Sequence, residues 1–118
     1  MQFAIIGAGA AGMNAATILR RKIPQSIIDV FSDEAYLYYS RPRLIEVLAN
    51  KTALEQIYFH TEQWYAANRI SLHTETSVKK ISIKNQNLII GKEGSFKYDR
   101  LLIATGGLAR VPKIEGAD

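Results

Sequence analysis

Apolar residues run in short unbroken stretches near both ends of the chain and alternate with polar residues between them. The stretch Gln2–Ile6 is apolar and rich in β-branched residues, which predicts a buried strand. A helical pattern then extends to Lys22, and Pro24 ends it. A second strand is expected at Ile27–Phe31. The residues predicted to share one face of the helix are Ala11, Ala15, Ile18 and Leu19.

The rest of the pattern predicts short helices followed by strands. A short helix is expected at 44–49, and Thr61 is a good N-cap for another. From Ile70 the period changes to two, which predicts an antiparallel meander. Its strands are expected at 70–72, 78–83, 88–90 and 96–98. The apolar run 100–104 predicts a parallel strand covered on both faces. The fold class predicted is therefore α/β, a Rossmann-like βαβ unit with a parallel sheet plus an antiparallel β-meander.

A glycine-rich turn joins the first predicted strand to the first helix. Gly7, Gly9 and Gly12 form a G-x-G-x-x-G pattern. Gly7 permits the tight turn, Gly9 leaves room for a pyrophosphate, and Gly12 lets the helix lie close to the sheet. The free N–H groups at the helix start, those of Ala10 and Ala11 included, would face a bound anion.

An acidic residue at the end of the second predicted strand completes the pattern of a dinucleotide-binding unit. Asp33 follows Gly12 by 21 residues, close to the spacing of about 20 that such units have. Its carboxylate can accept hydrogen bonds from both hydroxyls of a ribose, and it would repel a 2′-phosphate. Glu34 lies beside it, and Asp29 is a second candidate that ranks lower because it lies inside the strand. This stretch predicts binding of a dinucleotide or another adenosine compound.

The composition is that of an ordinary soluble globular domain. The 118 residues are 47% hydrophobic and 22% charged, enough for one domain. No apolar run approaches the roughly 20 residues of a membrane span, and the N-terminus lacks the pattern of a signal peptide. The absence of cysteine favours a cytoplasmic location and excludes a redox-active thiol pair within these residues.

The charge pattern and the histidines exclude further classes of site. The net charge of +4 comes from basic residues scattered along the sequence, with no basic stripe interleaved with aromatic residues, so nucleic-acid binding is not expected. His60 and His73 have no partners at metal or triad spacing. Neither a metal site nor a catalytic triad is expected, and Trp64 and Tyr65 are expected only to pack.

Three further segments add to the glycine loop and Asp33. Residues 36–44 read YLYYSRPRL, residues 64–78 contain WY, ISLH and a valine, and residues 98–112 contain YDRLLIATGG followed by Arg110 and a proline. Together these features resemble the pyridine-nucleotide–disulfide oxidoreductase family, in the N-terminal part of its FAD-binding domain. The second segment is similar to one in rubredoxin reductases, NADH oxidases and NADH-dependent nitrite reductases.

The resemblance implies cofactor contacts from each segment. The three glycines of the loop would cradle the FAD pyrophosphate, and Asp33, with Glu34 beside it, would hold the adenosine ribose. Val78 would present its backbone to the adenine edge. The remaining contacts implied by the resemblance come from Arg41, Pro42, Ala104, Thr105, Gly106 and Arg110. For Arg41 and Arg110, a solvated surface charge is the alternative interpretation.

The resemblance also implies an enzyme, an FAD-dependent NAD(P)H oxidoreductase. Electrons would pass from NAD(P)H through FAD to an acceptor such as a redox protein, oxygen or a nitrite-type centre. No catalytic residue is expected among these residues. Because the FAD domain of this family is discontinuous, residues 1–118 are expected to be its first segment, with the NAD(P)H-binding domain and the second FAD segment absent and the chain itself inactive.

Two alternatives to this function stay open. One is a non-catalytic nucleotide-binding Rossmann module, and the other is a Rossmann enzyme that uses NAD directly. The meander and the final threonine-glycine strand argue against the second. An unpaired sheet edge also leaves pairing into a homodimer open.

Overall fold

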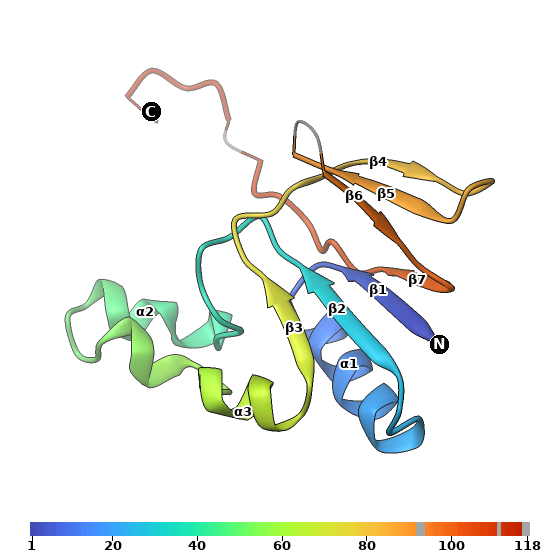
Figure 1. Ribbon diagram of the computed structural model, residues 1–118. Helices are drawn as coiled ribbons and strands as arrows, with labels where there is room; N and C mark the ends of the chain where they lie inside the picture. Colours follow the sequence, from blue (N-terminus) through green and yellow to red (C-terminus); the bar gives the residue numbers. More distant parts are fainter. Residues whose placement is uncertain (92–93, 111, 117–118) are drawn as a thin grey trace.

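The computed structural model describes residues 1–91, 94–110 and 112–116 (Figure 1). Its centre is a parallel sheet of four strands in the order β3-β2-β1-β7. These strands are β1 (Gln2–Ile6), β2 (Ile27–Phe31), β3 (Ile70–His73) and β7 (Arg100–Ile103). A parallel sheet with crossover helices and a separate antiparallel sheet confirms the predicted α/β fold class.

The helix α1 (Ala10–Lys22) connects β1 to β2 and covers one face of the sheet (Figure 1). Its buried residues are Gly12, Met13 and Ala16. Ala15 and Leu19 pack against the same cluster, as predicted. The prediction is wrong for the other two residues of that face, because Ala11 is exposed and Ile18 is 42% exposed. Gly12 packs closely against the turn after β1, and this contact sets the rotation of α1 about its axis. The rotation leaves Ile18 exposed although its side chain is larger and apolar.

The segment between β2 and β3 consists mainly of short helices. It contains η1 (Arg41–Arg43), α2 (Leu44–Leu48), η2 (Leu54–Ile57) and α3 (Glu62–Ala67). The hydroxyl of Thr61 accepts a hydrogen bond from the Trp64 backbone N–H at 3.3 Å, so the predicted N-cap is confirmed. Tyr65 is buried in the core beneath α1, and Trp64 packs against it. None of the described helices is long and apolar enough to cross a membrane.

An antiparallel meander lies on the other face of the sheet (Figure 1). Its strands are β4 (Val78–Ser82), β5 (Asn87–Ile90) and β6 (Gly94–Lys97). A second hydrophobic cluster joins Ala4 and Phe31 of the sheet to Leu88 and Tyr98. The alternation of strand side chains therefore separates the core into one layer against α1 and one against the meander.

The prediction that the meander begins at Ile70 is wrong. Ile70 and Leu72 lie in β3, which pairs in parallel with Ile28 and Val30 of β2. A period of two is the same in a parallel and an antiparallel strand, so the pattern could not assign the partner. The strand predicted to reach Ile83 also ends one residue earlier, and Ile83 is 83% exposed.

The prediction that the last strand is covered on both faces is also wrong. β7 lies at the end of the sheet order and pairs only with β1 among the described strands. Leu101 packs on the meander cluster, but Leu102 is partly exposed and Ile103 is 59% exposed. The apolar run indicates a strand of a parallel sheet, but it does not indicate whether other elements cover both faces of that strand.

Replacing Gly12 with alanine should destabilise the fold. A Cβ at this position would fall against the carbonyl oxygen of Gly7, far inside van der Waals contact. Since α1 must shift to admit it, we expect a loss of about 1–3 kcal/mol in the free energy of unfolding, measured by urea denaturation. The control is Gly9→Ala, because a Cβ there meets nothing within 4 Å. Equal stability of Gly12→Ala and the parent chain would contradict this packing.

Candidate functional site

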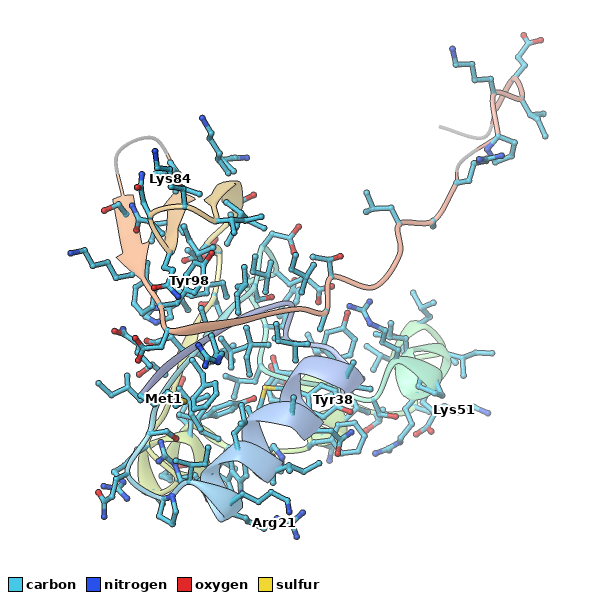
Figure 2. All side chains as sticks on the ribbon, turned by 90° about the vertical axis from the view of Figure 1, so that its right-hand side faces the viewer. Met1, Arg21, Tyr38, Lys51, Lys84 and Tyr98 are labelled. Atoms are coloured by element: carbon cyan, nitrogen blue, oxygen red, sulfur yellow. The ribbon has the colours of Figure 1, made fainter. Side chains whose placement is uncertain are left out.

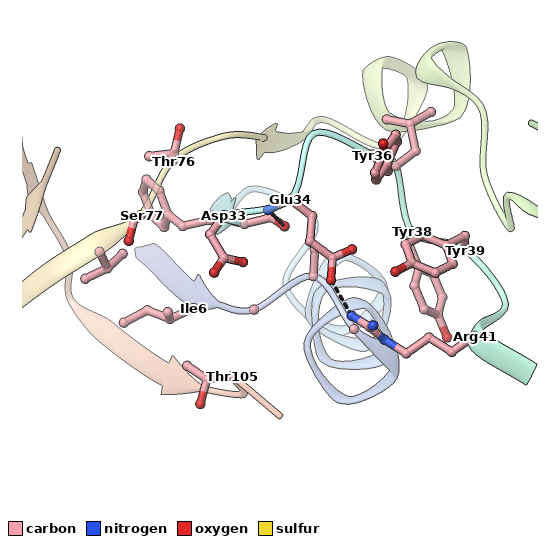
Figure 3. A pocket seen from close by; sticks show the side chains of 17 residues that line it. Ile6, Asp33, Glu34, Tyr36, Tyr38, Tyr39, Arg41, Thr76, Ser77 and Thr105 are labelled. Atoms are coloured by element: carbon pink, nitrogen blue, oxygen red, sulfur yellow. Dashed lines mark hydrogen bonds and ion pairs between the residues drawn. The ribbon is translucent and has the colours of Figure 1, made fainter. Parts of the chain in front are cut away.

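A pocket of about 180 Å³ opens at the carboxyl ends of β1 and β2 (Figure 3). Segments that are far apart in the sequence meet there. The lining consists of residues 6–9, 31–34, 36–39, Arg41, 76–78 and Thr105. In open α/β sheets, ligands bind outside the carboxyl ends of the strands, so this pocket lies where the fold class predicts a site.

The glycine turn forms one wall of the pocket. Gly7 has a φ of 109°, which favours glycine, and its N–H donates to the Phe31 carbonyl oxygen at 2.8 Å. A Cβ on Gly7 would fall against the Ala104 carbonyl, so the turn lies tightly between β2 and the end of β7. At Gly9 the space beside the backbone is open. The turn is therefore packed on its inner side and open on the side of the pocket.

Among the described residues, no side chain caps the amino end of α1 in competition with an anion. Gly9 is the N-cap, it makes no side-chain cap hydrogen bond, and the first turn contains no acidic residue. The first N–H groups of a helix have no intrahelical acceptor, and the helix dipole places partial positive charge there. In the described structure, this end of the 13-residue helix can thus accept a phosphate group.

Two aspartates of the β2 region have different environments. Asp33 is exposed and lines the pocket, as Figure 3 shows. Asp29 is 5% exposed, lies outside the pocket lining and has an Oδ1 atom 2.8 Å from Nε2 of His73. Asp33 is therefore available to a ligand in the pocket, whereas Asp29 is buried and contacts His73. The His73 partner was missed in the sequence because it lies 44 residues from Asp29.

An ion pair lies at the pocket on the side of the aromatic segment. Nη2 of Arg41 is 2.6 Å from Oε1 of Glu34, and the guanidinium lies 5.2 Å from the centre of the Tyr39 ring. Partial burial acts to raise the pKa of Glu34, but the hydrogen bonds from Arg41 and Tyr39 outweigh it and leave that pKa lowered. Glu34 is therefore ionised near neutral pH and holds the arginine over the pocket.

The comparisons with known proteins identify the family. The family described as Pyridine nucleotide-disulphide oxidoreductase matches residues 1–118. This chain belongs to that family. The predicted resemblance is confirmed, and homologues of the family bind FAD and use NAD(P)H as co-substrate.

Several relatives are similar over almost the whole chain. NADH-rubredoxin oxidoreductase of Clostridium acetobutylicum is 33% identical over 97% of this chain and 30% of its own length. Rubredoxin-NAD(+) reductase of Pseudomonas putida is 34% identical over 100% of this chain and 31% of its own. In the crystal structure of the covalent putidaredoxin reductase–putidaredoxin complex, a chain matches with a TM-score of 0.89 and 32% identity, over 98% of this chain and 28% of that one. The chain thus spans about 30% of the length of the relatives it matches.

The pocket brings together half of the residues that the sequence predicted as cofactor ligands. Those lining it are Gly7, Gly9, Asp33, Glu34, Arg41, Val78 and Thr105. The others lie beside it or away from it. Ala10, Ala11 and Gly12 form the first turn of α1, Pro42 lies in η1, and Ala104 and Gly106 flank Thr105.

Arg110 is a predicted ligand that lies away from the pocket. It is exposed, in the segment after β7 that leads away from the sheet (Figure 1). The resemblance relied on its sequence position after the threonine-glycine strand. That position alone does not determine the path of the chain after Gly107.

Several polar residues of the lining were not predicted from the sequence. Thr76 and Ser77 line the pocket immediately before Val78, and the Thr76 N–H donates to the Ser32 carbonyl at 2.7 Å. Tyr36 and Tyr38 line the opposite side. A signal was present, since all of these residues lie within segments that carry the resemblance. It was insufficient because no local pattern shows which of their side chains meet at the end of the sheet.

Proposed function

We propose that this chain binds FAD and forms the first segment of the discontinuous FAD-binding domain of an NAD(P)H-dependent flavoprotein oxidoreductase. The observation that carries the proposal is the open amino end of α1, which shares one pocket with Asp33 and Arg41. Membership of an FAD-binding family supports it. The NAD(P)H-binding domain and the second FAD segment would lie outside these 118 residues.

The chemistry of the pocket fits the ADP end of the cofactor. The N–H groups at the start of α1 would receive the pyrophosphate, and the open space beside Gly9 allows phosphate oxygens to approach the backbone. Asp33 would accept hydrogen bonds from the adenosine ribose. Val78, with Thr76 and Ser77, would border the adenine. The volume of about 180 Å³ is below the roughly 300–1,000 Å³ of sites that enclose drug-sized ligands, so the pocket would hold only part of a dinucleotide.

The residues of this chain would bind and orient the cofactor. Arg41 would lie along the pyrophosphate, on the side where its cation is already fixed by Glu34. Thr105, after β7, would border the cofactor from the sheet. FAD, when bound, supplies the redox chemistry, taking reducing equivalents from NAD(P)H and passing them to an acceptor. No acid, base or nucleophile among these residues is needed for that transfer.

The acceptor belongs to the same proposal. We infer a redox protein, oxygen or a nitrite-type centre, and relatives named for rubredoxin and for nitrite support the first and the third of these. No cysteine occurs in the 118 residues, so a thiol pair within them cannot be the acceptor. We further infer a cytoplasmic protein, because cysteine is absent, and no association with membranes, because no apolar run in the sequence approaches the length of a membrane span. We also infer a homodimer through an edge of the four-stranded sheet that is unpaired among the described strands.

Titration of the purified chain with FAD, NAD and ATP tests this function. We expect FAD to bind weakly, with quenched flavin fluorescence and a raised Tm, because the pocket contacts only part of the cofactor. ADP should compete with FAD, whereas riboflavin should not, since the contacts lie at the ADP end. Steady oxidation of NAD(P)H by this chain is not expected.

Each alternative gives a different result in that titration. NAD binding tighter than FAD binding would contradict the flavin assignment and favour an enzyme that uses NAD directly. Binding of ATP that is tighter than the binding of ADP and FAD would favour a non-catalytic nucleotide-binding module. A tight, stoichiometric yellow complex would contradict the expectation that the pocket holds only part of the cofactor.

The two aspartates give a matched pair of variants for the ribose contact. Asp33→Asn should weaken the binding of both FAD and ADP by about tenfold or more, because it removes a charged acceptor of two hydrogen bonds. Asp29→Asn should lower the Tm while leaving the affinity of the folded chain within about twofold, since Asp29 contacts His73 in the interior. Isothermal titration calorimetry of both variants measures this. The reverse pattern would show that Asp29, and not Asp33, recognises the ribose.

A further inference from the structure

The net positive charge of the chain is concentrated in the meander. The whole sequence has 15 lysines and arginines against 11 aspartates and glutamates, which gives +4. Positions 77–98 alone contain five lysines and one glutamate, which is also +4. The rest of the chain is therefore neutral overall, and the molecule is electrostatically asymmetric. The prediction that the basic residues are scattered along the sequence is therefore wrong for these positions.

The strand register places lysines on the outward face of the meander. Leu88 is fully buried against the sheet, so its neighbours Asn87 and Ile89 point the other way. Lys80 pairs with Ile89, and Lys97 pairs with Asn87. Both lysines are exposed, and they lie on the two outer strands of this face.

Further residues extend the same charged region. Lys79 is exposed at the irregularity in the β4–β5 register, and Lys84 is exposed at the turn, where Figure 2 shows it far from Arg21 and Lys51. Ile83, beside Lys84, is mostly exposed and offers an apolar contact. Within the described residues, none of the meander lysines takes part in a salt bridge. Their charge is thus not neutralised within the described chain.

We propose that this basic face, defined by Lys79, Lys80, Ile83, Lys84 and Lys97, is a docking surface for an acidic surface of a partner protein. Complementary charge would steer the partner and set its orientation, and the Ile83 side chain would supply a short-range contact. The inference is independent of the proposed function, because none of these residues lines the cofactor pocket.

The chemistry of the face favours a protein over other polyanions. Single-stranded nucleic acids stack their bases on exposed aromatic side chains, but Phe96 and Tyr98 of this region pack inward on the meander cluster. A membrane surface would need a broad apolar area beside the lysines, whereas the apolar side chains described on this face are Ile83 and the half-buried Ile89. Lys80 and Lys97 are two strands apart and offset by two residues in the register, roughly 12 Å in all, which suits separate carboxylates on a folded partner.

A charge-reversal experiment tests the docking surface. The probe is a fluorescein-labelled poly-L-glutamate peptide of about 20 residues, followed by fluorescence anisotropy at about 150 mM salt, where long-range attraction is screened. Lys80→Glu/Lys84→Glu/Lys97→Glu should weaken binding by at least about tenfold. The control variant, Lys22→Glu/Lys51→Glu/Lys113→Glu, makes the same charge change at exposed positions elsewhere and should change affinity by less than about twofold. Circular dichroism establishes that both variants are folded.

The other outcomes each overturn the proposal. Equal losses in the two variants would show that only net charge attracts the peptide. Tighter binding of a 20-nucleotide single-stranded DNA, or of vesicles containing phosphatidylserine, would assign the face to nucleic acid or membrane. Absence of peptide binding, with aggregation of the meander variant, would show that the lysines only protect the edges of β4 and β6 from pairing.

Discussion

The contact between the first turn of α1 and the turn that leaves β1 is the constraint on which the rest of the structure depends. Gly12 lies so close to the Gly7 carbonyl that no side chain fits between them. Gly7 in turn lies against Ala104, at the end of β7. One small set of backbone contacts therefore joins β1, α1 and the segment after β7, and directs the amino end of α1 toward the pocket.

This packing also arranges the electrostatics of the site. The helix end supplies partial positive charge without an acidic cap, which suits phosphate. Of the two adjacent carboxylates, Glu34 is engaged by Arg41 at 2.6 Å, whereas Asp33 is exposed in the lining. The ion pair thus leaves Asp33 as the carboxylate that can accept hydrogen bonds from a ligand. Both effects follow from chain geometry within the first 41 residues.

Features that depend on near neighbours could be predicted from the sequence. The glycine turn, the strand before it, the helix after it and the Thr61 cap are all determined within a few residues. Half of the candidate site followed from the same local patterns and from the resemblance. The polar lining at Thr76 and Ser77, and the Asp29–His73 contact, depend on where β3 pairs, and period-two alternation does not determine the partner of a strand. The exposure of Ile103 and the outward lysine face likewise depend on strand neighbours and not on strand sequence.

The central claim is that a diphosphate binds on the backbone N–H groups at the start of α1. The most direct measurement is an ADP titration of the ¹⁵N-labelled chain, followed through the backbone amide resonances. The account predicts that the largest shifts occur at Gly9, Ala10, Ala11 and Gly12, with smaller shifts at Asp33. Binding of ADP with these resonances unchanged, and the largest shifts on the meander lysines, would contradict it.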